Sequence, residues 1–402
     1  MSAPARVVIV GASIGGLTVA ESLRDEGFEG EITLLGDEPH LPYTRPPLSK
    51  QILAGEWQPE QAAIRTAAEL DELGILVRTG QRATGLDVET RTLHTADGPI
   101  PYDELVIATG TQPRQHPALP EASTLRTMDD ALRLRERLDA ARRVAVIGSG
   151  ILGSEIASAA RKRDAEVLLV GRSGALGFGG VGTLLSEELV RLHEAHGVEL
   201  ALRTELTGAE LAAAGPAGTA GAPDAVALEF ADGTTRTVDL VVTMIGGTPR
   251  TDWLASSTLD LADGIACDRL GIAAPGVSAV GDVAAWLDPI TGRHRRVEHQ
   301  SNAIEQAIAV AGRLAHGAEG AQPVPLFWSE IHGTRIHAYG WFGPERPLAE
   351  LPKTAESAGT VYGSHDGVGE LRGVVGWNAP PRDFRTARAA VVTTAHPLVA
   401  HS

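Results

Sequence analysis

Two glycine-rich segments point most directly to chemistry in this chain, and each follows a short apolar stretch. The first segment runs from Gly11 to Gly16, and the second, Gly148-Ser-Gly-Ile-Leu-Gly153, is a complete G-x-G-x-x-G pattern. Glycines at this spacing let backbone N–H groups approach a pyrophosphate at the positive end of a helix. Ser13 departs from the pattern, because it stands where the first segment would have its middle glycine. Two such segments in one chain predict two dinucleotide sites.

Acidic residues follow two other apolar stretches. Asp37 comes after residues 31–35, and Asp282 comes after residues 277–280. A carboxylate at the carboxyl end of a strand can accept hydrogen bonds from the ribose or polyol hydroxyls of a cofactor. For Asp282 the alternative is a cap at the start of the next helix. At the corresponding point of the second unit the sequence is Val170-Gly-Arg-Ser173, which has no carboxylate.

The elements that position these residues are predicted from the alternation of apolar and glycine-rich stretches. Both glycine segments open helices, to about Gly27 and Arg163, so each unit is β-α-β and the fold class is α/β. Further strands are predicted within 105–110, 166–170, 327–342, 360–364 and 371–377, followed by a helix over 381–394 with proline at its start. The Ala/Gly/Pro-rich segment 207–223 is predicted to be a mobile surface loop.

The composition narrows the class of protein. The 402 residues allow two to three domains, and 43% hydrophobic with 21% charged residues is typical of a globular protein. We expect no membrane span, no signal peptide and a cytoplasmic location. The net charge of −16 argues against nucleic-acid binding. Cys267 is the one cysteine, which excludes a disulfide within the chain and a C-x-x-C redox pair. No metal site is expected.

Several longer motifs share one order along nearly the whole chain. They are Pro42-Tyr-Thr-Arg-Pro-Pro-Leu-Ser-Lys50, Ala108-Thr-Gly-Thr-Gln-Pro-Arg114, Leu125-Arg-Thr-Met-Asp-Asp-Ala131, Val280-Gly-Asp-Val283, Val297-Glu-His-Gln-Ser-Asn-Ala303, Phe327-Trp-Ser-Glu330 and Gly376-Trp-Asn-Ala-Pro380. With these motifs the chain resembles FAD-dependent pyridine-nucleotide reductases, in particular the putidaredoxin-reductase-like ferredoxin reductases that serve bacterial oxygenases and haem monooxygenases.

The resemblance implies two Rossmann-like domains of the glutathione-reductase type and a smaller C-terminal α+β domain. The FAD-binding domain would comprise residues 1–114 and 245–320, the NAD(P)H-binding domain 115–244 and the C-terminal domain 321–402. The cofactor contacts it implies are Gly11, Ser13, Ile14, Gly15, Gly16, Asp37, Glu38, Arg45, Lys50, Arg82, Ala83, Thr109, Gly110, Arg126, Gly148, Gly150, Ile151, Leu152, Gly153, Arg172, Ser173, Gly246, Asp282, Glu298, Gln300 and Trp328.

Particular roles follow from the resemblance. Arg45 would bind the FAD pyrophosphate through its two-pronged guanidinium, and Lys50 would stabilise negative charge on the reduced flavin. Glu155 would pair with Lys50 and orient the nicotinamide carboxamide; its apolar neighbours predict that it is buried. Trp328 would shield the flavin ring. The alternatives are solvated charges, a helix-surface glutamate and a core tryptophan. Gln300 differs from the aromatic or aliphatic residue that relatives often have near the flavin.

The function implied is transfer of electrons from NADPH or NADH through FAD to a small iron–sulfur ferredoxin, by a monomer or weak dimer. The alternatives are a rubredoxin reductase and a redox-sensing interaction protein of the apoptosis-inducing-factor type. Arg172 and Ser173 favour NADPH, because they could bind its 2′-phosphate. Two arginine clusters, Arg293-His-Arg-Arg296 and Arg382, Arg385 and Arg388, are predicted to dock an acidic ferredoxin. The alternative is that these arginines are solvated and paired with acids such as Asp288 and Asp383.

Overall fold

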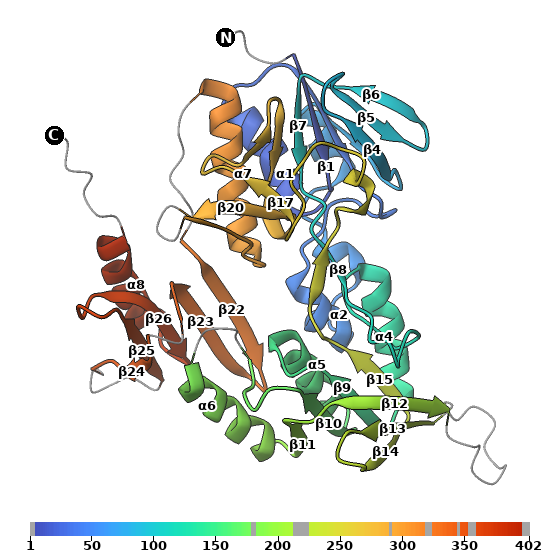
Figure 1. Cartoon of the computed structure of the whole chain (residues 1–402), viewed down its shortest axis with the longest axis vertical. Helices are drawn as coiled ribbons and strands as arrows, with labels where there is room; N and C mark the ends of the chain where they lie inside the picture. The colour runs from blue at the N-terminus through green and yellow to red at the C-terminus, as the bar shows by residue number, and fades with distance from the viewer. Residues whose placement is uncertain are drawn as a thin grey trace. The chain divides into compact units, whose positions relative to one another are not determined.

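The computed structural model describes residues 5–177, 182–211, 225–288, 292–317, 324–343, 346–352 and 359–395 (Figure 1). The chain forms two compact units. The first comprises Met1–Thr44, Glu60–Gln112 and Thr248–Pro325, and the second comprises Arg45–Pro59, Pro113–Gly247 and Leu326–Ser402. Each unit therefore collects segments that are distant in the sequence.

The first unit is built on a six-stranded sheet in the order β18-β19-β7-β1-β2-β3, parallel except for the β18–β19 pair. Its central strand β1 is buried on both faces, since Val7, Val8 and Ile9 are fully buried. Helices α1 and α7 pack against each other (Figure 1), and both contribute side chains to the core beside the sheet.

The elements of the first unit, with η marking short 3₁₀ helices, are β1 (Arg6–Val10), α1 (Ile14–Asp25), β2 (Glu31–Leu35), α3 (Ala67–Glu72), β3 (Ile75–Arg78), β4 (Ala83–Asp87), β5 (Thr92–Thr95), β6 (Gly98–Pro101), β7 (Glu104–Ile107), η3 (Asp252–Leu254), β17 (Ile265–Cys267), β18 (Ile272–Ala274), β19 (Val277–Ala279), η4 (Gly281–Val283), β20 (Ala284–Asp288), β21 (Arg293–Arg295) and α7 (Gln300–His316). Strands β4–β6 and β17, β20 and β21 form two further three-stranded sheets. The segments η2 (Pro59–Ala62), β8 (Thr111–Pro113) and β16 (Gly247–Pro249) lie where the chain passes from one unit to the other.

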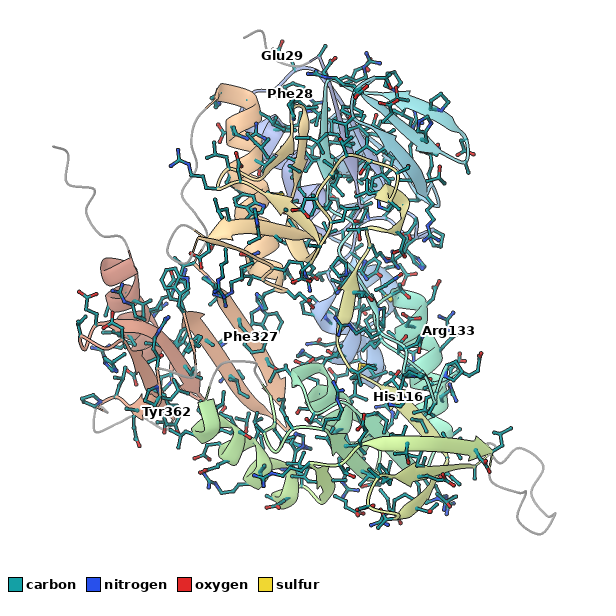
Figure 2. The ribbon with its side chains drawn as sticks, viewed as in Figure 1. Phe28, Glu29, His116, Arg133, Phe327 and Tyr362 are labelled. Carbon is teal, nitrogen blue, oxygen red and sulfur yellow. The ribbon has the colours of Figure 1, made fainter. Side chains whose placement is uncertain are left out.

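The second unit has a four-stranded parallel sheet in the order β11-β10-β9-β15, a three-stranded sheet β12-β13-β14 and a five-stranded antiparallel sheet β22-β23-β26-β25-β24. Its elements are η1 (Pro46–Ser49), α2 (Gln51–Ala54), α4 (Met128–Ala140), β9 (Arg143–Ile147), α5 (Ile151–Arg161), β10 (Glu166–Gly171), α6 (Gly182–Ala195), β11 (Val198–Leu202), β12 (Leu206–Leu211), β13 (Val226–Phe230), β14 (Thr235–Val238), β15 (Leu240–Thr243), β22 (Leu326–Ile331), β23 (Thr334–Gly340), β24 (Leu348–Glu350), β25 (Thr360–His365), β26 (Leu371–Trp377) and α8 (Pro381–Ala395). Figure 2 labels Phe327 on β22 and Tyr362 on β25 of the five-stranded sheet.

The α/β class and both predicted β-α-β units are confirmed by this fold. The C-terminal strands and the closing helix from Pro381 are also confirmed, with residues 327–342 divided into two strands at His332 and Gly333. The prediction of a loop from residue 207 is wrong at its start, because 207–211 pair with β13 as part of β12. Residues 212–223 of that prediction lie outside the described residues.

Within the described ranges, no helix is long and apolar enough to cross a membrane. The same ranges contain no group of three or more His, Cys, Asp or Glu side chains placed to hold a metal ion.

Candidate functional site

The two glycine segments fold into closely similar turns between a strand and a helix. Gly11 has φ +118° and Gly148 has φ +119°. A Cβ on Gly11 would lie 2.2 Å from the Ala108 carbonyl oxygen, and a Cβ on Gly148 would lie 2.1 Å from that of Met244. Both conditions restrict these two positions to glycine. In each unit the turn therefore brings the backbone against the neighbouring strand's end at the same point.

The helix starts in the two turns also match. Ser13 is the N-cap of α1 with φ −115°, and Gly150 is the N-cap of α5 with φ −75°; both are extended. Because neither position needs a positive φ, a serine is as acceptable there as a glycine. The departure at Ser13 thus leaves the backbone of the turn unstrained. Gly16 and Gly153 allow close packing, since a Cβ on either would lie 2.0 Å from the carbonyl oxygen of Gly11 or Gly148.

The acidic residue after β2 has a partner that the sequence analysis did not predict. The Asp37 carboxylate accepts a hydrogen bond of 2.8 Å from Arg250 Nη1. The Arg250 carbonyl in turn accepts from Thr109 Oγ1 at 3.0 Å, and its N–H donates to the Gly110 carbonyl. The chain after β16 is therefore fastened beside the end of β7. Arg250 adds a cation to this end of the first unit.

Other predicted contacts of the first unit lie around the same strand ends. Glu38 accepts from the Tyr43 hydroxyl at 2.5 Å, while Arg82 is exposed and Ala83 begins β4 in the core. Asp282 lies inside η4 rather than at its N-cap, so the capping alternative is wrong. Among the described residues the buried amide oxygen of Gln300 has no hydrogen-bond partner.

These features fit FAD as the cofactor of the first unit. The turn from Gly11 to Gly16 opens a helix of twelve residues, the Asp37 carboxylate is 37% exposed, and an uncompensated amide oxygen is available at Gln300. Pyrophosphate, ribose hydroxyls and a hydrogen-bond donor on the ligand are the groups that such positions bind. Glu298 accepts a hydrogen bond of 2.8 Å from Arg296 Nη1. It lies two residues before the start of α7.

In the second unit, the G-x-G-x-x-G turn lines a cavity of about 960 Å³. The cavity is bordered by the turn, by Gly246 and by the end of β10, including Arg172 and Ser173. His116, labelled in Figure 2, lines it as well. A Cβ on Gly150 would meet nothing within 4 Å. The open side of Gly150 therefore leaves space for a ligand where the start of α5, with Ile151 and Leu152, presents backbone N–H groups.

The end of β10 is shaped by Gly171. A Cβ there would lie 2.3 Å from Ser149 Oγ and 2.7 Å from Ser149 Cβ. A carboxylate-bearing residue is therefore excluded at this position unless Ser149 moves. Arg172 and Ser173 follow directly and are exposed at the cavity.

The Lys50–Glu155 pair forms a compact buried cluster within the second unit. Lys50 Nζ lies 2.7 Å from Glu155 Oε1, and the two side chains are 17% and 8% exposed. Ser329 Oγ donates to Glu155 Oε1 and Ser49 Oγ donates to Oε2, each at 2.5 Å. Three donors therefore converge on one buried carboxylate. The predicted burial of Glu155 is confirmed.

The side chain of Trp328 lies beside Lys50 rather than in the core. Lys50 Nζ is 5.3 Å from the centre of the indole ring, and Trp328 is 38% exposed. The core-tryptophan alternative is therefore wrong.

Elsewhere in this unit, Arg45 Nη1 donates to the Arg126 carbonyl, so the two predicted FAD-binding arginines lie side by side. A cavity of about 460 Å³ opens beside Lys50 and Glu155.

Three residues that contact the predicted site residues were not predicted from the sequence: Ser49, Ser329 and Arg250. Ser49 and Ser329 both stand in motifs quoted above, next to Lys50 and Trp328, so their positions in the sequence could have indicated them. Ser329 is 174 residues from Glu155 and Arg250 is 213 residues from Asp37. No local pattern links residues at those separations.

A second cluster in this unit consists of three histidines, of which His193 is buried, His332 is partly buried and His196 is exposed. His332 Nε2 lies 3.1 Å from His193 Nδ1, and the His196 ring stacks on His332 with centroids 4.1 Å apart. Burial, together with the charges of His193, His196, Arg161 and Lys162, lowers the pKa of His332 to about 3. Burial and His196 lower the pKa of His193 to about 4. Both imidazoles are therefore neutral in the folded protein near pH 6.

This cluster predicts a loss of stability in mild acid. In the unfolded chain these histidines take up protons below about pH 6.5, whereas in the folded protein they do so only near pH 3 to 4. The free energy of unfolding should therefore fall as the pH drops from about 6.5 to 4, by up to about 1.4 kcal/mol per pH unit for each such histidine. The thermal unfolding midpoint between pH 7 and 5 measures this.

The matched variants are His332→Asn and His94→Asn. His332 has φ +48°, which asparagine tolerates, and His94 is exposed on β5. Between pH 7 and 5, the thermal unfolding midpoint should fall by the same number of degrees in wild type and in His94→Asn. It should fall less in His332→Asn. Equal losses in all three proteins would mean that the histidine cluster does not govern the acid response.

Two β-α-β units with matching glycine turns define an α/β protein with two dinucleotide-binding folds. Comparison with known families agrees: the chain belongs to the pyridine nucleotide-disulphide oxidoreductase family, whose model matches residues 5–307. It is therefore an oxidoreductase by family.

Individual relatives are similar over most of their length. The chain is 34% identical to the ferredoxin–NAD(+) reductase component of the p-cumate 2,3-dioxygenase system of Pseudomonas putida over 83% of this chain and 81% of that one. It is 33% identical to the corresponding subunit of the benzene 1,2-dioxygenase system of Pseudomonas putida, over 96% and 92%. The crystal structure of the covalent putidaredoxin reductase–putidaredoxin complex superposes with a TM-score of 0.87 at 28% identity, covering 98% of this chain and 94% of that chain.

Proposed function

We propose that this protein is an NAD(P)H-dependent flavoprotein reductase that passes electrons from FAD to a small iron–sulfur ferredoxin. The observation that carries the proposal is the presence of two glycine turns together with a single, inert cysteine. Cys267 is 1% exposed, and burial raises the pKa of its thiol to about 12. With no thiol pair to relay electrons, reducing equivalents must pass directly to an external acceptor.

When bound, FAD supplies hydride acceptance from the nicotinamide and release of single electrons. The chain's own residues place the cofactors. Asp37 and the turn at Gly11 would hold the adenosine and pyrophosphate of FAD, and Arg45 with Arg126 would neutralise its phosphates. Lys50 would favour negative charge on the flavin, while Glu155 would orient the nicotinamide carboxamide.

The remaining parts of the proposal follow from the same assignment. Residues 1–114 and 245–320 would bind FAD, 115–244 would bind the nicotinamide nucleotide, and 321–402 would form the C-terminal domain. Relatives named as ferredoxin reductases of oxygenase systems support a ferredoxin as the partner. We place the enzyme in the cytoplasm as a monomer or weak dimer, serving an oxygenase or a haem monooxygenase.

Two measurements test this function. The purified protein should release FAD on acid treatment, and it should reduce an oxygenase-type ferredoxin in repeated turnovers with NADH or NADPH. A protein that takes up FAD but is reduced only once and slowly, with no turnover, would fit a redox-sensing interaction protein instead. A clear preference for rubredoxin over ferredoxin would identify the partner as rubredoxin.

NADPH is expected to be accepted as a substrate. Gly171 leaves no carboxylate to repel a 2′-phosphate; two like charges about 4 Å apart would cost roughly 4 kcal/mol at an effective dielectric constant near 20. Arg172 is exposed at the cavity beside the glycine turn and would pair with that phosphate. In Arg172→Ala, kcat/KM for NADPH should fall about tenfold while that for NADH changes little. The printed names of the relatives specify NAD(+), so an NADH preference unchanged in Arg172→Ala would overturn the NADPH assignment.

The arginine clusters should steer ferredoxin docking, but not all of their members can do so. Arg296 is bound to Asp263 and Glu298, with a side chain 10% exposed, so the ion-pair alternative holds for this residue. Arg388 lies over the Tyr339 ring, 4.4 Å from its centre. Arg293 and Arg295 on β21 and Arg382 and Arg385 on α8 are exposed. These four arginines are the docking candidates.

Charge reversal tests them in pairs. Arg293→Glu with Arg295→Glu, or Arg382→Glu with Arg385→Glu, should slow ferredoxin reduction about tenfold at low salt, because opposite charges steer the encounter. Reduction of ferricyanide should stay unchanged. Arg236→Glu, an exposed site on β14, serves as the control. Equal losses with both acceptors would assign the clusters to folding or cofactor binding, and no loss with either pair would place docking elsewhere.

A further inference from the structure

The Glu155 carboxylate is held by three donors from two separate segments of the second unit. Glu155 projects from α5, while its donors come from the end of η1, from Lys50 directly after η1, and from β22. Oε1 accepts from Lys50 Nζ and Ser329 Oγ, and Oε2 accepts from Ser49 Oγ. With both oxygens engaged, the carboxylate plane is fixed about its last torsion.

The hydroxyl of Ser329 reaches Glu155 because of how β22 packs. Ser329 is 2% exposed and pairs with Ile336 of β23 in the antiparallel sheet. Three residues further on, the N–H of His332 donates to Ser158 Oγ at 2.9 Å. Ser158 lies on α5 one turn after Glu155, so two hydroxyl contacts fasten β22 along one face of the helix.

The pair formed by Lys50 and Glu155 depends on this strand in a second way. Trp328, next to Ser329, places its indole ring 5.3 Å from Lys50 Nζ. The two neighbouring residues of β22 thus contact both members of the ion pair. A strand more than 170 residues away from Glu155 in the sequence contributes directly to its environment.

We infer that Ser329 is a positioning residue for Glu155, which makes the C-terminal sheet part of the nicotinamide site. The inference rests on the proposed function of Glu155. The Ser329 hydroxyl acts through the carboxylate: it fixes the orientation in which Glu155 holds Lys50 and faces the nicotinamide carboxamide. Ser329 needs no contact with either cofactor for this role.

The test is a double-mutant cycle on the FAD-loaded protein. Ser329→Ala should slow flavin reduction by NAD(P)H about tenfold in anaerobic rapid mixing, the effect of losing one hydrogen bond to a charged group. Ser329→Thr, which keeps the hydroxyl, should restore most of the rate. In a Glu155→Gln background, Ser329→Ala should cause little further slowing, because its effect passes through the carboxylate. Nucleotide affinity, measured by equilibrium titration, gives a readout independent of turnover.

Ser364→Ala is the matched control. Ser364 is a fully buried serine of the same sheet. Its hydroxyl donates to the Arg346 carbonyl and not to Glu155. An equal slowing in Ser364→Ala, or an undiminished effect of Ser329→Ala in the Glu155→Gln background, would reduce Ser329 to a structural role and overturn the inference. If Glu155→Gln itself leaves flavin reduction unchanged, the proposed role of Glu155 fails instead.

Discussion

Glu155→Gln should slow flavin reduction by NAD(P)H by at least about 100-fold while the protein still binds FAD. Glutamine keeps the size of the side chain and can still accept hydrogen bonds, but it removes the charge that compensates Lys50. Breaking one partner of a buried ion pair typically costs 3–5 kcal/mol, and about 1.4 kcal/mol corresponds to a tenfold change in rate. Anaerobic rapid mixing with NADPH, followed by flavin absorbance, measures the rate directly.

The control is Glu187→Gln, at an exposed position of α6. It should reduce flavin at the wild-type rate. Glu155→Gln should also retain FAD, while its thermal unfolding midpoint should fall, because the Lys50 ammonium loses its charged partner. A flavin reduction rate within about threefold of wild type would show that Glu155 has no part in placing the nicotinamide.

Gly150→Val should greatly weaken binding of the nicotinamide nucleotide and leave FAD binding unchanged. A Cβ at Gly150 meets no protein atom within 4 Å, so the fold has room for it, and its extended backbone suits a β-branched residue. The added side chain fills the space where the pyrophosphate meets the backbone N–H groups. Loss of two hydrogen bonds to a charged group weakens binding on the order of 100-fold. Equilibrium titration with NADPH measures the affinity.

Gly153→Ala provides the contrast. Its Cβ would lie 2.0 Å from the Gly148 carbonyl oxygen, so α5 must shift away from β9 and the thermal unfolding midpoint should fall. Gly150→Val should lower nucleotide affinity, and it should lower that midpoint less than Gly153→Ala does, because its added side chain meets no protein atom and only weakens the N-cap of α5. If Gly150→Val leaves NADPH affinity unchanged, the cavity of 960 Å³ beside the turn is not the nucleotide site.

The two β-α-β units could be predicted because their determinants are local. An apolar stretch, a positive-φ glycine at Gly11 or Gly148, and a close-packing glycine five residues later together specify strand, turn and helix. The burial of Glu155 was also predictable, since its neighbours on α5 are apolar. The same reasoning could not separate β12 from the low-complexity segment that follows it, because β12 is specified by its pairing with β13.

The partners of the predicted residues could not be found in this way. Arg250 meets Asp37 and Ser329 meets Glu155 only because the chain leaves and re-enters each unit. Local patterns also could not predict which arginines are exposed and able to dock a partner. Arg295 and Arg296 are adjacent, yet Arg295 is exposed and Arg296 is paired with Asp263 and Glu298. Chemistry could be assigned to motifs from the sequence, whereas the contacts that tune it required the fold.

The most direct test of the central claim is an anaerobic titration of the FAD-loaded protein. NADPH is added in an amount equal to the flavin, and two equivalents of oxidised iron–sulfur ferredoxin are then mixed in, because reduced FAD carries two electrons and each ferredoxin accepts one. The flavin and ferredoxin absorbances are followed separately. We expect the flavin to bleach on the first addition and to regain its colour on the second, as ferredoxin becomes reduced. A flavin that stays bleached beside oxidised ferredoxin, or that never bleaches with NADPH or NADH, would contradict the assignment of this protein as a ferredoxin reductase.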